Sequence, residues 1–174
     1  MELAKLLQES ADCAGRGFQA GLGEQWEDVT VPPSRRRTAW HEAGHAVVAW
    51  DQGFAVVLVS IRRVGNSFGR STHTPAADCS IDSERHRENI VAMGGWAAEQ
   101  ASGEAGDRTY DDDDLQCLAN RSPEDRLTIE LGWAEQEAAR IVRSNLDRVE
   151  RLAGVLLERT ELSDAAEIKA IVEG

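Results

Sequence analysis

Apolar residues recur every three or four positions over much of the chain, a spacing that is typical of amphipathic helices. The first clear helix is predicted from about Arg35 to Asp51, because Ser34 can cap its start and Gly53 can end it. Its apolar stripe is formed by Trp40, Ala43, Val47 and Trp50. One face of this helix is therefore expected to pack against the core.

The same pattern predicts further helices in the second half of the chain. One runs from about residue 80 or 82 to residue 102, and a short one runs from about residue 112 to residue 120. A long helix begins at the capping sequence Ser122-Pro123-Glu124 and continues to about Glu158, and Ser163 caps a last short helix. The helix that ends near residue 102 contains small residues that permit close helix packing, namely Gly94, Gly95, Ala97 and Ala98.

One segment has the composition of β-strands. Residues 56–64 are rich in β-branched side chains and end at the turn Gly65-Asn66-Ser67. A second short strand is predicted over residues 69–74, antiparallel to the first and ending at Pro75. The predicted fold class is therefore mainly α, with one small β-hairpin or short sheet.

The chain is expected to hold one domain over residues 34–174, preceded by an N-terminal appendage over residues 1–33. A short helix is predicted over residues 1–9, and Pro32-Pro33 separates the appendage from the domain. A length of 174 residues with 41% hydrophobic residues fits a single folded core.

Charge and composition limit the partners of the protein. The formal net charge is -12, and the only compact basic run is Arg35-Arg36-Arg37, so nucleic acid is not expected to bind. The most apolar window, residues 46–61, is interrupted by Asp51-Gln52-Gly53, and no targeting segment is seen, so no membrane association is expected. The three cysteines lie far apart without a CxxC motif, which favours a cytoplasmic location.

The sequence His41-Glu42-Ala43-Gly44-His45 predicts a metal site on the first helix. Two histidines four residues apart project side by side, so their imidazoles can hold one Zn²⁺. Glu42 lies about 100° around the same turn, near enough to take a proton from a water molecule at the metal. This HExxH pattern indicates a zinc hydrolase with one zinc ion per chain.

A hydrolytic zinc site usually has a third protein ligand, and the sequence offers several. Asp51 has the spacing of the third ligand in extended HExxH motifs, but Val48 stands where those motifs need a glycine. Glu99 lies on the second predicted helix and is a further candidate. The other candidates are Asp111, Asp112, Asp113, Asp114, His73 and His86, of which the two histidines are expected to be ordinary strand or surface residues.

Four ordered blocks of the sequence resemble the peptidase domain of the FtsH family of ATP-dependent zinc proteases. They are "TAWHEAGHAVVAW", "IVAMGGWAAEQASGE", "DDLQCLA" and the C-terminal "AARIVRSNLDRVERLAGVLLERTELSDAAEI". The resemblance covers roughly residues 35–170. It implies a helical zinc endopeptidase fold in which two histidines and a distant aspartate bind the metal.

The resemblance also assigns roles to individual residues. The family aspartate precedes the leucine of the third block and so maps onto Asp114, with Asp113 as its neighbour. Glu99 is then expected to orient a ligand histidine through the free ring nitrogen. The stretch "GRSTHTP" resembles the strand with which the family is thought to hold the substrate backbone, which implies substrate contacts at Gly69, Ser71, Thr72 and Thr74.

The sequence also departs from the family. It has no P-loop motif GxxxxGK[ST] and no membrane span, and the region between Asp114 and Ser122 is shorter than in the family. We therefore expect a stand-alone, ATP-independent metalloendopeptidase that hydrolyses flexible or unfolded polypeptides.

Two other functions remain open at this stage. A peptidase-like fold with little or no activity can serve as an interaction or adaptor subunit, either in a homo-oligomer or bound to an ATP-dependent protease. A small repressor-cleaving zinc peptidase fits the size of the chain but does not account for the second and third blocks.

Overall fold

The computed structural model describes residues 34–65, 67–74, 81–103, 114 and 127–174. The expected N-terminal appendage, and the helix expected over residues 112–120 apart from Asp114, lie outside the described residues. All described elements belong to one compact unit, Pro32–Gly174. Helices predominate in it, with one small antiparallel sheet, as the apolar pattern predicts.

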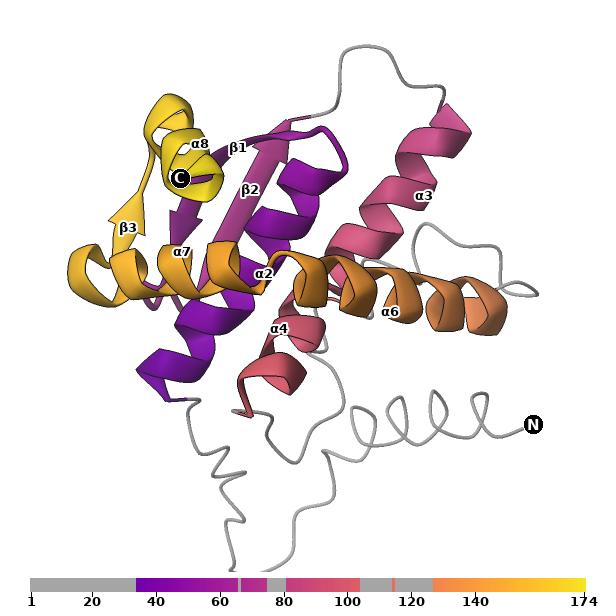
Figure 1. The fold of residues 1–174 in the computed structure, drawn as a ribbon, viewed down its shortest axis with the longest axis horizontal. Coiled ribbons are helices and arrows are strands. Elements are labelled where there is room, and N and C mark those ends of the chain that lie inside the picture. The colour runs from indigo at the N-terminus through magenta and orange to yellow at the C-terminus, as the bar shows by residue number, and fades with distance from the viewer. Residues whose placement is uncertain (1–33, 66, 75–80, 104–113, 115–126) are drawn as a thin grey trace, which may run out of the picture. The chain divides into compact units, whose positions relative to one another are not determined.

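Helix α2 (Arg35–Asp51) is the central element of this unit (Figure 1). The predicted cap is confirmed, because the Ser34 hydroxyl accepts a hydrogen bond from the Arg37 backbone N–H at 3.0 Å. Its inner face is fully buried at Ala39, Ala43, Ala46, Val47 and Val48. Helix α2 contacts α4 on one side and the sheet and α7 on others, so it forms the centre of the core.

The sheet contains three strands in the order β2-β1-β3. Strands β1 (Ala55–Ser60) and β2 (Arg70–Thr74) form the predicted antiparallel pair. The first strand was expected to reach Val64, but it ends at Ser60, whose hydroxyl accepts a hydrogen bond from the backbone N–H of Arg62. Strand β3 (Glu161–Leu162) was not predicted, because a strand of two residues leaves no periodic pattern.

The single helix expected over residues 80–102 is two helices, α3 (Ile81–Ala92) and α4 (Gly94–Ser102). Met93 lies at the break with its side chain fully buried. The break precedes two consecutive glycines, which lack intrinsic helix propensity. It redirects the chain so that α4 can pack against α2.

The long helix expected up to Glu158 is also two helices, α6 (Leu127–Ser144) and α7 (Leu146–Arg159). They meet at Asn145, whose side-chain amide donates a hydrogen bond to the Ile141 carbonyl at 3.0 Å. An asparagine side chain that bonds to nearby backbone competes with the helical ladder, which explains the interruption.

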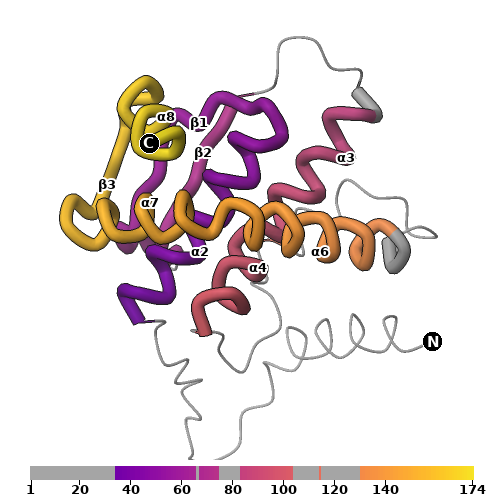
Figure 2. Tube along the Cα trace, viewed as in Figure 1, coloured from indigo at the N-terminus to yellow at the C-terminus, as the bar shows by residue number. Residues whose placement is uncertain are grey.

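Helix α8 (Ala165–Glu173) is capped by Asp164, and the expected cap at Ser163 is wrong. The Asp164 carboxylate accepts hydrogen bonds from the backbone N–H groups of Ala166 and Glu167. Helix α8 then lies against β1 and α7 (Figure 2). No helix in the described ranges is both long and apolar enough to cross a membrane.

The crossing of α2 and α4 depends on glycine. A Cβ atom on Gly44 would lie 2.5 Å from the Ala98 Cβ and closer still to the Gly94 carbonyl oxygen. A Cβ on Gly94 would in turn lie 2.9 Å from the Gly44 carbonyl oxygen. The two helices therefore meet backbone to backbone, which places α4 directly beside the two motif histidines.

Substituting Gly44→Ala should destabilise the fold by about 1–3 kcal/mol, because the added methyl group must push α4 away from α2. Gly154→Ala is the matched control, since its Cβ would meet nothing within 4 Å and it lies inside α7. That control should stabilise the helix by roughly 0.5–1 kcal/mol. Urea unfolding of both variants measures the difference, and equal midpoints would contradict the backbone contact.

Candidate metal centre

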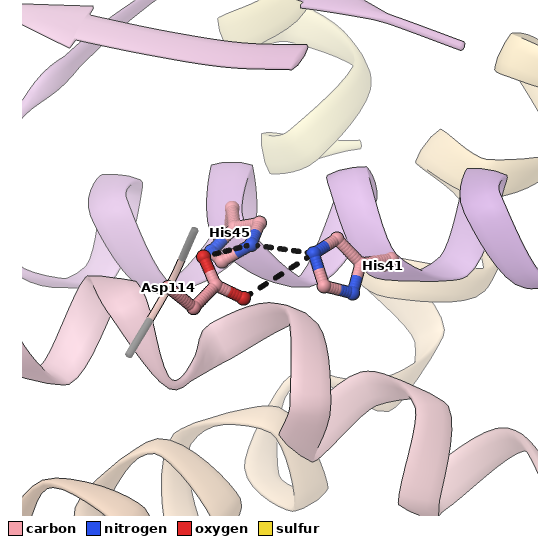
Figure 3. Close-up of side chains that lie close together, drawn as sticks. All are labelled: His41, His45 and Asp114. Atoms are coloured by element: carbon pink, nitrogen blue, oxygen red, sulfur yellow. Dashed lines mark hydrogen bonds and ion pairs between the residues drawn. The ribbon is translucent and has the colours of Figure 1, made fainter. Parts of the chain in front are cut away.

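The two motif histidines point to the same place from successive turns of α2 (Figure 3). Their Nε2 atoms lie 2.9 Å apart, and the planes of the two rings are inclined by 76°. Both residues are half-buried, so solvent reaches the pair from a limited direction.

Asp114 completes the cluster (Figure 3). One carboxylate oxygen lies 3.4 Å from His41 Nε2, and the other lies 3.4 Å from His45 Nε2. One ligand atom from each of the three residues lies within 4.8 Å of the other two. Among the described residues, this is the only group of three histidine, cysteine or acidic side chains that meets this test.

The other ring nitrogen of each histidine is held by a hydrogen-bond acceptor. His45 Nδ1 lies 2.8 Å from the Val91 carbonyl oxygen, and His41 Nδ1 lies 2.9 Å from a carboxylate oxygen of Glu99. A carbonyl can only accept, so His45 must donate from Nδ1. Glu99 holds His41 in the same way, and each neutral ring then presents a lone pair at Nε2.

Glu99 is fixed as a charged acceptor by Arg37. The Arg37 guanidinium reaches one Glu99 oxygen through two nitrogens, each at 2.8 Å, while the other oxygen faces His41. This ion pair is only partly exposed, so the carboxylate keeps a defined orientation. Glu99 therefore lies behind His41 and not among the three converging groups.

The donor set fits a divalent cation. Two Nε2 lone pairs 2.9 Å apart repel each other unless a proton or a metal ion lies between them. The Asp114 oxygen that faces His41 is buried, and no hydrogen bond reaches it in the described part of the chain. Two imidazoles and one carboxylate are ligands that Zn²⁺ accepts, with a position left for water or substrate.

The electrostatics agree with a cation between these groups. Burial alone would lower the pKa of His45, but the charge of Asp114 and its hydrogen bond raise that pKa to about 10. The neighbouring histidines lower the pKa of Asp114 against the effect of burial. Without a metal, His45 therefore holds a proton at neutral pH in the place of the cation.

Glu42 follows His41 in α2, so its side chain points about 100° away around the same turn. Its side chain is 6% exposed, and its charge contributes to the raised pKa of His45. A Cβ on Gly69 would lie 2.8 Å from the Glu42 carboxylate carbon, so this carboxylate rests against the backbone just before β2. The expected base is thus close to the cluster but outside the three converging groups.

The other candidate ligands do not reach the cluster. Asp51 is exposed at the end of α2, and His73 is bound to Glu88 at 3.0 Å. His86 is exposed, with its ring 5.2 Å from that of Trp133. Asp111, Asp112 and Asp113 lie outside the described residues.

The expected substrate-binding residues lie on and just before the edge strand β2 (Figure 1). Ser71, Thr72 and Thr74 pair with β1, and Gly69 precedes the strand. Ser71 is paired with the fully buried Val59, so its side chain shares the inner face of the sheet.

Sequence reasoning missed three contributors to the cluster: Arg37, Gly95 and the Val91 carbonyl. A Cβ on Gly95 would lie 2.6 Å from the Nε2 atoms of both histidines. The consecutive glycines 94 and 95 predict close helix packing. They also leave room for two imidazole rings.

An HExxH helix, three converging side chains and an adjacent glutamate are typical of zinc metallopeptidases. The chain belongs to peptidase family M41, whose family model matches residues 28–118, more than half of the chain. Family membership implies zinc as the metal.

Two curated proteins are similar to this chain. The ATP-dependent zinc metalloprotease FtsH 1 of Rhodopirellula baltica is 36% identical over 83 residues, which cover 45% of this chain and 12% of that protein. The ATP-dependent zinc metalloprotease FtsH of Acidothermus cellulolyticus is 32% identical over 117 residues, which cover 56% of this chain and 18% of that protein. The matched regions thus span less than a fifth of either relative.

Zinc affinity should rise with pH. The metal must displace the proton of His45, whose pKa is raised to about 10, because only a neutral imidazole binds a metal. If one proton is released on binding, zinc affinity should increase about tenfold per pH unit between pH 7 and 9. Calorimetry in buffers of different ionisation enthalpy counts the protons, and zinc uptake without proton release would contradict this prediction.

Asp114→Ala should remove zinc, whereas Glu99→Ala should retain a measurable but weaker site. The first variant loses a converging oxygen, while the second loses only the acceptor that orients His41, which typically costs about 10- to 100-fold in affinity. Asp51→Ala is the matched control and should keep about one zinc per chain. The zinc content of the purified variants tests whether Asp114 is the third ligand. This assignment is wrong if Glu99→Ala loses zinc while Asp114→Ala keeps it.

Proposed function

We propose that the domain is a zinc-dependent endopeptidase that hydrolyses peptide bonds in flexible or unfolded polypeptides. The observation that carries the proposal is the convergence of two imidazole lone pairs and the Asp114 carboxylate beside the buried Glu42. His41, His45 and Asp114 would hold the ion. When bound, Zn²⁺ supplies a Lewis acid that polarises the scissile carbonyl and makes water a better nucleophile.

Glu42 then carries the proton. Its carboxylate accepts a proton from the attacking water as the oxygen of that water bonds to the carbonyl carbon. The same proton passes to the amide nitrogen as the carbon–nitrogen bond breaks. One water is consumed, and the products are a carboxylic acid and an amine, which ionise to a carboxylate and an ammonium ion at neutral pH, so Glu42 returns to its starting state.

The edge strand β2 supports a mode of substrate binding. Among the described strands its outer side has no partner, and an extended peptide can pair with such an edge through its backbone. Gly69, Ser71, Thr72 and Thr74 would provide this surface. Backbone pairing requires an extended chain and few particular side chains, which favours unfolded substrates.

The chemistry assigned to these residues needs no nucleotide, and we propose that cleavage of an already unfolded polypeptide is independent of ATP. The alternative is an adaptor with a peptidase fold that acts in a homo-oligomer or beside an ATP-dependent protease. The complete set of His41, Glu42, His45 and Asp114 favours the enzyme, since an adaptor has no need to keep a base next to a metal site.

Glu42→Gln should keep zinc and lose peptide cleavage by a factor on the order of 10²–10⁴, because the amide cannot accept the proton. The measurement is zinc content together with the rate of casein cleavage. Glu150→Gln, an exposed change on α7, is the matched control and should behave as the wild type. Wild-type protein that is loaded with zinc and cleaves no unstructured protein would refute the peptidase proposal and favour the adaptor.

A further inference from the structure

The backbone conformation at residue 69 does not require a glycine. Other glycines, such as Gly53 and Gly103, have positive φ values that disfavour a side chain, but the φ of Gly69 lies outside that range. What a side chain at Gly69 would meet is Glu42. A Cβ atom would lie 2.7 Å from Cγ and 2.8 Å from the carboxylate carbon, and closer still to Oε1.

The contact is specific to the base. All three of the nearest atoms to such a Cβ belong to the Glu42 side chain, and none belongs to backbone or to a metal-site histidine. Glu42 is buried, so its carboxylate has little room to turn away. The backbone at Gly69 therefore forms one wall of the space in which this carboxylate lies.

We propose that Gly69 is a positioning residue, which sets the place of the Glu42 carboxylate by leaving the space of a side chain empty. This inference rests on the proposed function, in which Glu42 is the base. It differs from the substrate-binding role proposed for the same stretch, because Gly69 acts here on the enzyme's own carboxylate. A methyl group at this position should displace the base and leave the metal ligands in place.

Gly95 provides the contrasting case, because it lies against the two motif histidines. A Cβ at Gly95 would lie 2.5 Å from His41 Cε1 and 2.6 Å from both Nε2 atoms. The two rings are held at Nδ1 by Glu99 and the Val91 carbonyl, so they cannot move aside without losing those bonds. Gly95→Ala should therefore abolish zinc binding, whereas Gly69→Ala should lower only the rate of peptide cleavage.

The test compares Gly69→Ala, Gly95→Ala and the control Gly154→Ala. Zinc content, urea unfolding, kcat and KM are measured for each with an unstructured peptide substrate. Gly69→Ala should remain folded and keep the zinc and the KM of the wild type, while kcat falls by about 10- to 100-fold, since a misplacement near 1 Å can cost that much. Gly95→Ala should lose zinc, and Gly154→Ala should keep zinc and activity.

A second variant tests whether the effect passes through Glu42. Glu42→Asp shortens the side chain by one methylene, which withdraws the carboxylate from the added methyl group. The factor by which Glu42→Asp lowers kcat should therefore be at least tenfold smaller in Gly69→Ala than in the wild type. Additive losses from the two changes would overturn the proposal.

Other results for Gly69→Ala would also test its positioning role. Unchanged kcat in Gly69→Ala would overturn the proposal, as would a raised KM with unchanged kcat, which would limit Gly69 to its proposed contact with the substrate. Loss of zinc or of folded protein in Gly69→Ala would overturn it too. If the wild type cleaves nothing, the proposed function fails by itself, and crystal structures of the wild type and Gly69→Ala still show whether the Glu42 carboxylate is displaced.

Discussion

The contact between α2 and α4 is the constraint on which the metal centre depends. Gly44 and Gly94 let the two helix backbones meet, and only at this separation can α4 and the end of α3 reach the outer nitrogens of the motif histidines. Glu99 comes from α4, and the carbonyl of Val91 comes from the last turn of α3. A wider crossing would leave both rings free to rotate, and two freely rotating imidazoles bind a metal poorly.

This close packing brings charged groups together in a place with little water. Three carboxylates, Glu42, Glu99 and Asp114, surround two imidazoles, and burying so many charges is costly unless each is paired. Arg37 offsets the charge of Glu99 from outside. Asp114 faces the space between the rings, and the charge of Glu42 also acts on His45, so one cation there, a proton or a metal ion, compensates much of the cost. The fold is thus more stable with a cation bound than without one.

Much of this arrangement could be predicted from the sequence because it is local. The i, i+4 histidines, the cap at Ser34 and the hairpin each depend on residues within a few positions of one another. The interruptions at Met93 and Asn145 could not be predicted, since the apolar period continues across both and tertiary packing decides where the helix ends. The cap of α8 is Asp164 and not its neighbour Ser163, and since both residue types cap helices well, the sequence does not decide between them.

The candidate metal ligands were likewise only partly predictable from local sequence. Motif spacing and residue type left Asp51, Glu99, a run of four aspartates, His73 and His86 open as the third ligand, and only the family resemblance indicated Asp114. The structure brings Asp114 to the histidines from a segment far along the chain, a closure that no local pattern records. The supporting contacts of Arg37, Val91 and Gly95 are likewise products of packing.

The helical period of α2 separates the two halves of the site. His41 and His45 face α4, while Glu42, about 100° away, faces the start of β2. The two histidines are thus oriented by contacts from α3 and α4, whereas the Glu42 side chain lies against the backbone at Gly69, so a change on one side need not disturb the other. A peptide paired with the outer edge of β2 would run beside the strand that directly follows Gly69, whose backbone lies against the Glu42 side chain. In such an arrangement the element that aligns the substrate also forms the wall behind the proton acceptor, which ties the position of the scissile bond to that of Glu42.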